Sequence, residues 1–189
     1  MSSISVTEGA VSAPTAFRAP ALVRLQRQVD VPSRWTLLLI GLWVLYRTRS
    51  AGIEVAWQVR VALYALPALG MTAYWFTRGE AAAARRITRV VAYASFLLDG
   101  LFACALIWRD GGIGSPLYIL LVLLSVKAVV LSPALRRLVW LPFAFGPLYI
   151  GALWLASGSL AFLADPAFLA RYALLWVWLI GSVIISYEL

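Results

Sequence analysis

The sequence predicts an all-α integral membrane protein with six transmembrane helices and both termini in the cytoplasm. Three observations support this: 63% of the 189 residues are hydrophobic, the mean hydropathy is +0.89, and the charged residues cluster between long apolar runs. Soluble domains are usually closer to half apolar. A helix of about 20 apolar residues crosses the ~30 Å hydrocarbon core of a bilayer. One helical bundle therefore accounts for the whole chain.

Two short segments precede the predicted spans. Residues 1–16 are rich in Ser, Thr, Ala, Gly and Pro without periodicity, so we expect a disordered tail. Residues 17–30 carry apolar side chains at helical spacing with arginines between them. This pattern predicts a short amphipathic interfacial helix, with a partly ordered basic tail as the alternative. The six-helix domain then occupies residues 31–189.

Six apolar runs are long enough to be spans, at about 33–50, 54–77, 89–108, 116–133, 138–157 and 171–187. Three prolines lie inside them: Pro67, Pro142 and Pro147. Each proline removes a backbone donor, so it should kink or locally unwind its helix. The longest connection, 158–170, is apolar and is expected to lie in the interface, where Asp165 and Pro166 can begin a helical turn.

The distribution of arginines predicts the orientation, because basic residues accumulate on the cytoplasmic side of a membrane. With the N-terminus inside, the cytoplasmic segments carry Arg18, Arg24, Arg27, Arg34, Arg78, Arg85, Arg86, Arg89, Arg136 and Arg137. The outer segments carry only Arg47, Arg49, Arg109 and Arg171. Omitting the first span would place the N-terminal arginines outside, which argues for six spans.

Composition also excludes several functions. The net charge of +8 comes from arginines that flank spans, so lipid headgroups rather than nucleic acid explain it. The chain has no histidine, which removes histidine phosphotransfer, Ser-His-Asp hydrolysis and His-ligated metals within this segment. We interpret the single cysteine, Cys104, as a packing residue. We therefore expect neither an enzyme nor a metal site in this chain.

Two opposite charges lie at similar depth in neighbouring spans. Asp99 lies about 15 Å before the outer end of the third span, and Lys127 lies about as far into the fourth. A buried charge in lipid is costly unless it is paired. We therefore predict an Asp99–Lys127 pair, shared with Arg60 of the second span, as a candidate sensing site. A pair that only fixes register, or a lysine that reaches toward Arg136, is the alternative.

The connection between these spans is rich in glycine. Gly111 and Gly112 can adopt the positive φ angles that other residues resist, and Ser115 with Pro116 can begin the next helix. The exposed backbone of such a turn can also offer N–H groups to a ligand, so these four residues are candidate ligand-binding positions. A tight turn with no further role is the alternative.

Asp99 followed by Gly111-Gly112-Ile113-Gly114-Ser115-Pro116-Leu117-Tyr118 resembles the N-terminal six-helix input domain of many bacterial sensor histidine kinases. The resemblance covers about 35 residues, with only span number and charge layout agreeing elsewhere. In the redox-responsive branch of that family this turn is associated with quinone. Ser115 and Leu117 stand where that branch has Asn and Phe. Quinone is thus a cofactor that the resemblance alone implies.

The resemblance implies a signal-input module of a two-component system in the bacterial inner membrane. It implies a homodimer whose sixth span passes a membrane or outer-face signal to a cytoplasmic kinase output domain. The chain would then be either a segment of a longer kinase or a stand-alone relative. Two other functions remain open: an accessory subunit of a larger membrane complex, and a small transporter or channel.

Overall fold

The computed structural model describes residue 24 and residues 26–48, 55–77, 86–131 and 136–188. The described residues form six α-helices and no strand. These helices are α2 (Val31–Thr48), α3 (Val55–Thr77), α5 (Arg86–Arg109), α6 (Ile119–Leu131), α7 (Phe145–Ser157) and α8 (Pro166–Glu188). Shorter helical turns precede or join them: η1 (Gln26–Asp30), η3 (Gly112–Gly114), η4 (Pro116–Tyr118), η5 (Arg136–Ala144) and η6 (Ala161–Ala164).

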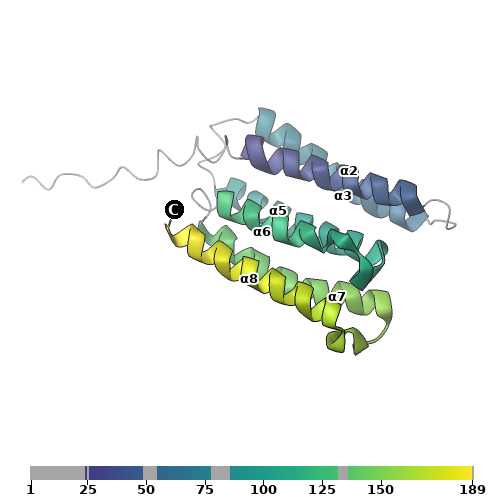
Figure 1. Ribbon diagram of the computed structural model, residues 1–189. Helices are drawn as coiled ribbons and strands as arrows, with labels where there is room; N and C mark the ends of the chain where they lie inside the picture. Colours follow the sequence, from purple (N-terminus) through teal and green to yellow (C-terminus); the bar gives the residue numbers. More distant parts are fainter. Residues whose placement is uncertain (1–23, 25, 49–54, 78–85, 132–135, 189) are drawn as a thin grey trace, which may run out of the picture.

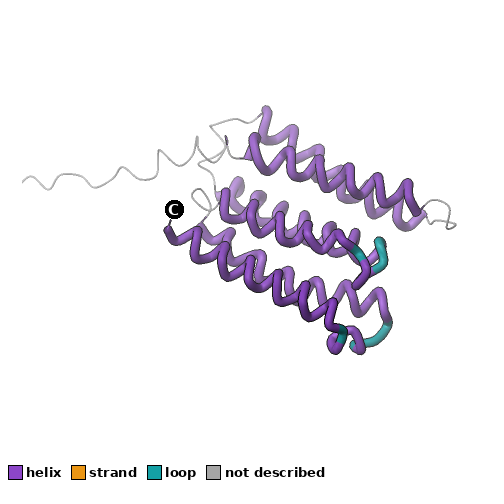
Figure 2. Tube along the Cα trace, viewed as in Figure 1, coloured by secondary structure: helices purple, strands orange, loops and turns teal. Residues whose placement is uncertain are grey.

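The six helices run side by side along one direction and alternate in sense (Figure 1). Helix α2 packs on α3, α5 packs on α7, and α6 packs on α8, while α5 joins the α2/α3 pair to the rest. The beginning of α2 and the end of α8 lie at the same end of the bundle. Almost all of the described chain is helical, with short loops at the far end (Figure 2).

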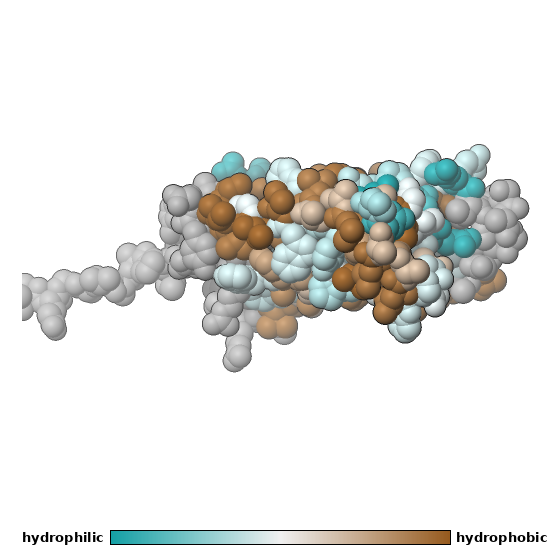
Figure 3. Space-filling view, turned by 60° about the horizontal axis from the view of Figure 1, so that its bottom comes forward, coloured by the Kyte–Doolittle hydropathy of each residue, from teal (hydrophilic) through white to brown (hydrophobic). Residues whose placement is uncertain are grey.

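Three stretches of helix are long and apolar enough to cross a membrane: Val90–Arg109, Trp140–Ser157 and Pro166–Ser186. The stretch Pro116–Leu131 is apolar but shorter. On the face shown in Figure 3, apolar surface covers much of the length of the bundle, and most strongly hydrophilic surface lies toward its ends. The described residues thus show an all-helical protein with three membrane-length helices.

The observed helices follow the predicted spans closely, with two differences. Helix α8 begins at Pro166, several residues before the predicted 171, because Asp165 Oδ1 accepts a hydrogen bond from Ala167 N at 2.7 Å and caps the first turn. The fifth span is divided into a 3₁₀ segment, η5, which contains Pro142, and the α-helix α7. Pro67 lies inside α3 without ending it.

The predicted interfacial helix at 17–30 is described only at its end. Residues 26–30 form the π-helical turn η1, which runs directly into α2, and residues 17–23 and 25 lie outside the described part. The side chain of Asp30 is 2% exposed. The end of this segment therefore belongs to the bundle interior.

Large aromatic side chains fill the contact between α5 and α7. Phe145 of α7 is fully buried and stacks on Phe96 of α5 with ring centroids 5.5 Å apart. Its ring lies against Gly100, where a Cβ atom would be only 2.1 Å from Phe145 Cε1. Gly100 is therefore required for the close approach of these two helices.

Candidate functional site

Asp99 and Lys127 meet in the interior of the bundle. Lys127 Nζ donates a hydrogen bond to Asp99 Oδ2 at 2.6 Å, and the two side chains are 4% and 0% exposed. Helices α5 and α6 run antiparallel from the glycine turn (Figure 1), so positions equally far from the turn reach the same level. The pairing predicted from the sequence is present.

Two further charged residues complete the cluster: Asp30, at the end of η1, and Arg34, in the first turn of α2. Asp30 Oδ1 lies 2.5 Å from Lys127 Nζ, and Asp30 Oδ2 lies 2.7 Å from Arg34 Nη2. Arg34 Nε lies 3.4 Å from Asp99 Oδ1. Each carboxylate therefore contacts both cations. We call Asp30, Arg34, Asp99 and Lys127 the ionic quartet.

Uncharged groups complete the surroundings of the quartet. The Tyr64 hydroxyl of α3 donates to Asp99 Oδ1 at 2.8 Å, and Arg34 Nη2 donates to the Ser95 hydroxyl. Lys127 Nζ also lies 5.8 Å from the centre of the Phe96 ring. Helices α2, α3, α5 and α6 thus all supply a side chain to one polar centre.

The quartet contains two negative and two positive charges, so its formal charge is zero. Moving charges out of water is costly, and only close partners compensate for that cost. Removing one partner from a buried pair typically destabilises a protein by about 3–5 kcal/mol, because the other charge stays buried. The quartet therefore fixes the relative positions of its helices.

Asp30 and Arg34 were not predicted to belong to this site. The sequence interpretation placed Asp30 in a surface helix and counted Arg34 only as a cytoplasmic flanking charge. A signal was present in their spacing, since residues four apart on a helix face the same side and can pair. The contact of Asp30 with Lys127 joins helices far apart in the sequence, which spacing alone does not reveal.

Arg60 does not share the quartet, contrary to the prediction. Its side chain is exposed, and its guanidinium lies 4.7 Å from the centre of the Trp108 ring. Trp108 stands near the end of α5, about 14 Å along the axis from Asp99 at 1.5 Å per residue. Arg60 is thus at the level of the glycine turn.

The glycine turn has the predicted backbone geometry. Gly111 and Gly112 have φ angles of +103° and +60°, which favour glycine. The Ser115 hydroxyl accepts a hydrogen bond from Leu117 N at 3.1 Å and donates one to Asp110 Oδ2 at 2.8 Å. Pro116 occupies the first position of η4, as expected for a helix start.

Arg171 connects the glycine turn to α8, the last helix, through hydrogen bonds. Its Nη1 donates to the carbonyl oxygen of Ile113 and, at 3.2 Å, to that of Ser115. Its guanidinium also lies 5.0 Å from the centre of the Tyr118 ring. The sequence analysis counted Arg171 only as an outer flanking charge, because nothing in the spacing relates it to the turn.

Asp110, Ser115 and Arg171 form a second polar group at the glycine turn. Asp110 extends this second polar group toward α2. Arg47 Nη1 lies 3.5 Å from Asp110 Oδ1, but the Arg47 side chain is 61% exposed. An exposed ion pair of this kind contributes little stability. The part-buried contact of Arg171 is therefore the stronger connection of the turn to another helix.

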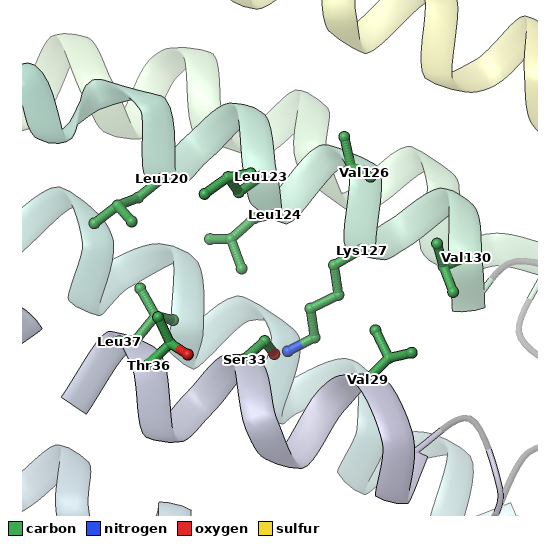
Figure 4. A pocket seen from close by; sticks show the side chains of 10 residues that line it. All are labelled: Val29, Ser33, Thr36, Leu37, Leu120, Leu123, Leu124, Val126, Lys127 and Val130. Atoms are coloured by element: carbon green, nitrogen blue, oxygen red, sulfur yellow. The ribbon is translucent and has the colours of Figure 1, made fainter. Parts of the chain in front are cut away.

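Two cavities adjoin the quartet. One, of about 290 Å³, lies between α2 and α6, where Lys127 reaches across toward α2 beside Ser33 among apolar side chains (Figure 4). The other, of about 280 Å³, is lined by residues of α2, α3 and α5, including Arg34, Tyr64 and Asp99. Both volumes are close to the lower limit of small-molecule sites.

The chemistry available at this centre is ionic and hydrogen-bonding. In the described part of the chain, no three His, Cys, Asp or Glu side chains gather as metal ligands. Cys104 is buried and free. The arrangement can hold helices in register, and it can respond to a ligand or to a change in packing.

Comparison of the chain with protein-family models, with curated proteins and with solved structures finds no match. The fold and the site of the described residues define a class: an all-helical protein with three membrane-length helices and a buried ionic cluster.

Proposed function

We propose that this chain is a membrane-embedded signal-input module of a two-component sensor kinase, with six spans in a bacterial inner membrane. A change in packing at the quartet or at the glycine turn alters the position of α8. Helix α8 then passes the change to a cytoplasmic output domain.

The observation that carries this proposal is the contact of Arg171 with the turn. Its hydrogen bonds to the Ile113 and Ser115 carbonyls connect the segment between α5 and α6 directly to α8. A displacement of the turn must either move α8 or break these bonds. The same turn precedes α6, the helix that carries Lys127. The turn therefore connects the quartet to α8.

Buried charges suit such a switch because they have few alternative arrangements. An ionic cluster in low-dielectric surroundings is either paired or strongly destabilised, so small shifts favour one discrete packing over another. A signal needs only to bind the two packings with different affinity to change their populations. The quartet joins η1, α2, α5 and α6, and Tyr64 adds α3, which allows one local event to reach several helices.

The direction of output follows from the bundle geometry. The end of α8 lies at the same end of the bundle as the beginning of α2 (Figure 1), and the arginine distribution assigns this end to the cytoplasm. Exposed apolar residues run along α8, including Val177, Ile180 and Ile184. We propose that this face pairs with a second copy near the dimer axis.

A kinase fusion tests the proposal. The end of α8 is joined in helical register to the coiled coil of a histidine kinase core, and autophosphorylation is measured in membranes. Asp99→Asn should change kinase output, and Arg171→Ala should abolish that change. Arg60→Ala is the matched control, because Arg60 is exposed and lies outside both polar groups.

Equal output from all folded variants would contradict a sensory role. Folding is checked by gel filtration of each variant before its output is compared. Obligatory co-purification with other membrane subunits, with no isolated dimer, would instead favour an accessory subunit.

A further inference from the structure

A groove with a volume of about 290 Å³ lies between α5 and α7, away from the quartet. The residues that line it include Leu101, Ala105 and Trp108 of α5, and Leu148, Gly151 and Leu155 of α7. Leu101 and Leu155 are 51% and 66% exposed, so the groove is open to the surroundings of the bundle. Its apolar walls suit a hydrocarbon occupant.

The groove runs along the two helices. Leu101, Cys104, Ala105 and Trp108 follow one another at spacings of three or four residues or side by side, so they share one face of α5. At 1.5 Å per residue, Leu101 and Trp108 are about 10 Å apart along the axis. This length is about a third of the ~30 Å hydrocarbon core of a bilayer. The shape therefore fits part of one acyl chain lying parallel to the helices.

Arg60 stands at one end of this groove, beside Trp108. The guanidinium of Arg60 lies 4.7 Å from the centre of the Trp108 ring, and Trp108 lines the groove. The Arg60 side chain is exposed, and within the described part of the chain it forms no ion pair with a carboxylate. The ring contact uses one face of the planar guanidinium. Its N–H groups therefore remain available to an oxygen acceptor outside the protein.

The charges around the end of α5 favour an anionic acceptor. Arg47, Arg60 and Arg109 lie at this end of the helix, and among them stands one carboxylate, Asp110. Asp110 already pairs with Arg47 at 3.5 Å. Basic side chains near a membrane surface attract anionic lipid headgroups. A phosphate beside Arg60 would therefore reduce a local excess of positive charge.

Arg47 and Trp43 provide a useful contrast. The Arg47 guanidinium lies 5.5 Å from the centre of the Trp43 ring, so it too is an exposed arginine over an indole. Arg47 has a carboxylate partner, however, and Trp43 lines neither this groove nor the two cavities beside the quartet. Of the two arginines, only Arg60 combines an unpaired charge with an adjoining apolar groove.

We propose that the α5/α7 groove binds an acyl chain of an anionic phospholipid, whose phosphate contacts Arg60. Trp108 lies between the two parts of the ligand, with Arg60 on its ring and the acyl chain beside it in the groove. Neither the quartet nor the glycine turn supplies a residue to this groove. The lipid site therefore does not depend on the proposed sensory function.

The test uses the full chain in nanodiscs of phosphatidylcholine. The probe is phosphatidylglycerol with a photoactivatable diazirine in one acyl chain, and mass spectrometry locates the labelled peptides. We expect label on residues 101–108 and 147–155, about fivefold more than from phosphatidylcholine with the same diazirine chain. Unlabelled phosphatidylglycerol should compete for the site. Equal labelling by the two probes is the result of general contact with the bilayer and would overturn the proposal.

The same labelling separates a lipid from a free anion. Inorganic phosphate has no acyl chain, so its addition should leave the labelling of the groove unchanged. If inorganic phosphate abolished the preference for phosphatidylglycerol, Arg60 would be a site for a free anion, and the assignment to a phospholipid would be wrong.

Variants of Arg60 test the headgroup contact. Arg60→Gln should remove most of the roughly fivefold preference for phosphatidylglycerol, whereas Arg60→Lys should retain much of it because the charge remains. Arg47→Gln is the matched control and should leave the preference unchanged, since Trp43 does not line the groove. Equal effects of Arg60→Gln and Arg47→Gln would indicate a diffuse surface potential and contradict a site at Arg60.

A second pair of variants tests the groove itself. An added Cβ atom meets nothing within 4 Å at Gly151, which lines the groove, or at Gly70 of α3, which does not. Gly151→Phe should block labelling of the groove, and Gly70→Phe should leave it unchanged. Persistent labelling in Gly151→Phe would contradict an acyl chain at this position.

A second copy of the chain is the other possible occupant of the groove. Leu155→Cys, combined with Cys104→Ala, reports on it, because Leu155 lies at the exposed rim. We expect the lipid probe to label this variant and oxidation to give no disulfide between copies. Quantitative disulfide formation with loss of lipid labelling would assign the groove to a protein interface and overturn the proposal.

Discussion

Lys127 Nζ lies 2.5 Å from Asp30 Oδ1, although the two residues belong to opposite halves of the chain. Together with the 2.6 Å contact to Asp99, this places one ammonium between two carboxylates from different helices. The start of the bundle at η1 and the fourth α-helix, α6, are thereby joined through a charge. Leaving this charge without a partner in the low-dielectric interior would be costly.

Neutralising one member of the quartet should destabilise the fold strongly. Asp99→Asn leaves an excess positive charge among buried side chains, so we expect a loss of about 3–5 kcal/mol in the free energy of unfolding. Equilibrium unfolding in mixed micelles measures it. Adding Lys127→Met restores neutrality and should recover part of the loss, and a double variant no better than the single one would contradict the charge argument.

The hydroxyl of Tyr64 should contribute a smaller amount. Tyr64→Phe removes the 2.8 Å hydrogen bond to Asp99 but keeps the ring, which stacks on Phe102 with centroids 3.9 Å apart. We expect a loss of about 1.5–3 kcal/mol, the range for hydrogen bonds to charged groups. The control is Tyr46→Phe, whose side chain is largely exposed and should tolerate the change.

The turn should tolerate a side chain at one glycine but not at another. At Gly112 the φ angle is +60° and a Cβ atom would lie 3.2 Å from Ala156 Cβ, so Gly112→Ala should cost about 1–3 kcal/mol. Gly114→Ala meets nothing within 4 Å and should be nearly neutral. Thermal unfolding in detergent compares them, and equal melting temperatures would argue against a strained turn.

Close packing of α5 on α7 gives a third pair of variants. Gly100→Ala would force a Cβ atom onto the Phe145 ring and displace α7, at about 1–3 kcal/mol. Gly151→Ala on α7 has open space and serves as the control. Spin labels on α5 and α7 should report a wider separation for the first variant only.

Topology can be tested with single cysteines after Cys104→Ala. Ser159 is exposed at the end of the bundle that holds the glycine turn, and Glu188 ends α8 at the opposite end. With six spans, a membrane-impermeant maleimide should label Ser159→Cys in intact cells and Glu188→Cys only after permeabilisation. Labelling of both in intact cells would contradict the proposed arrangement.

Contacts between consecutive helices were predictable from the sequence, and contacts between distant helices were not. Asp99 and Lys127 flank a short turn, so equal counts of residues from it place them at one level. Arg60 lay in the expected span, but its position along α3 brings it to Trp108 instead. Depth estimates from sequence therefore hold best where a tight turn fixes the register.

The remaining site residues depended on tertiary packing. Asp30 ends the segment predicted to lie on the membrane surface, where an acidic residue is ordinary, and its contact with Lys127 of α6 is made in the interior. Arg171 bonds backbone carbonyls, which every residue possesses, so no residue pattern marks its target. Hydrogen bonds to backbone atoms far away in the sequence carry no sequence signature, unlike the local caps of Ser115 and Asp165.

The quartet draws its charges from η1, α2, α5 and α6, so α7 and α8 contact the rest of the bundle mainly through apolar side chains and Arg171. Charge pairing is directional, whereas the hydrophobic effect is not, so the position of α7 and α8 depends on how closely their side chains fit. The bundle therefore divides into a part whose register is set by charge pairs and a pair of helices whose register is set by side-chain packing, with the hydrogen bonds of Arg171 connecting the two.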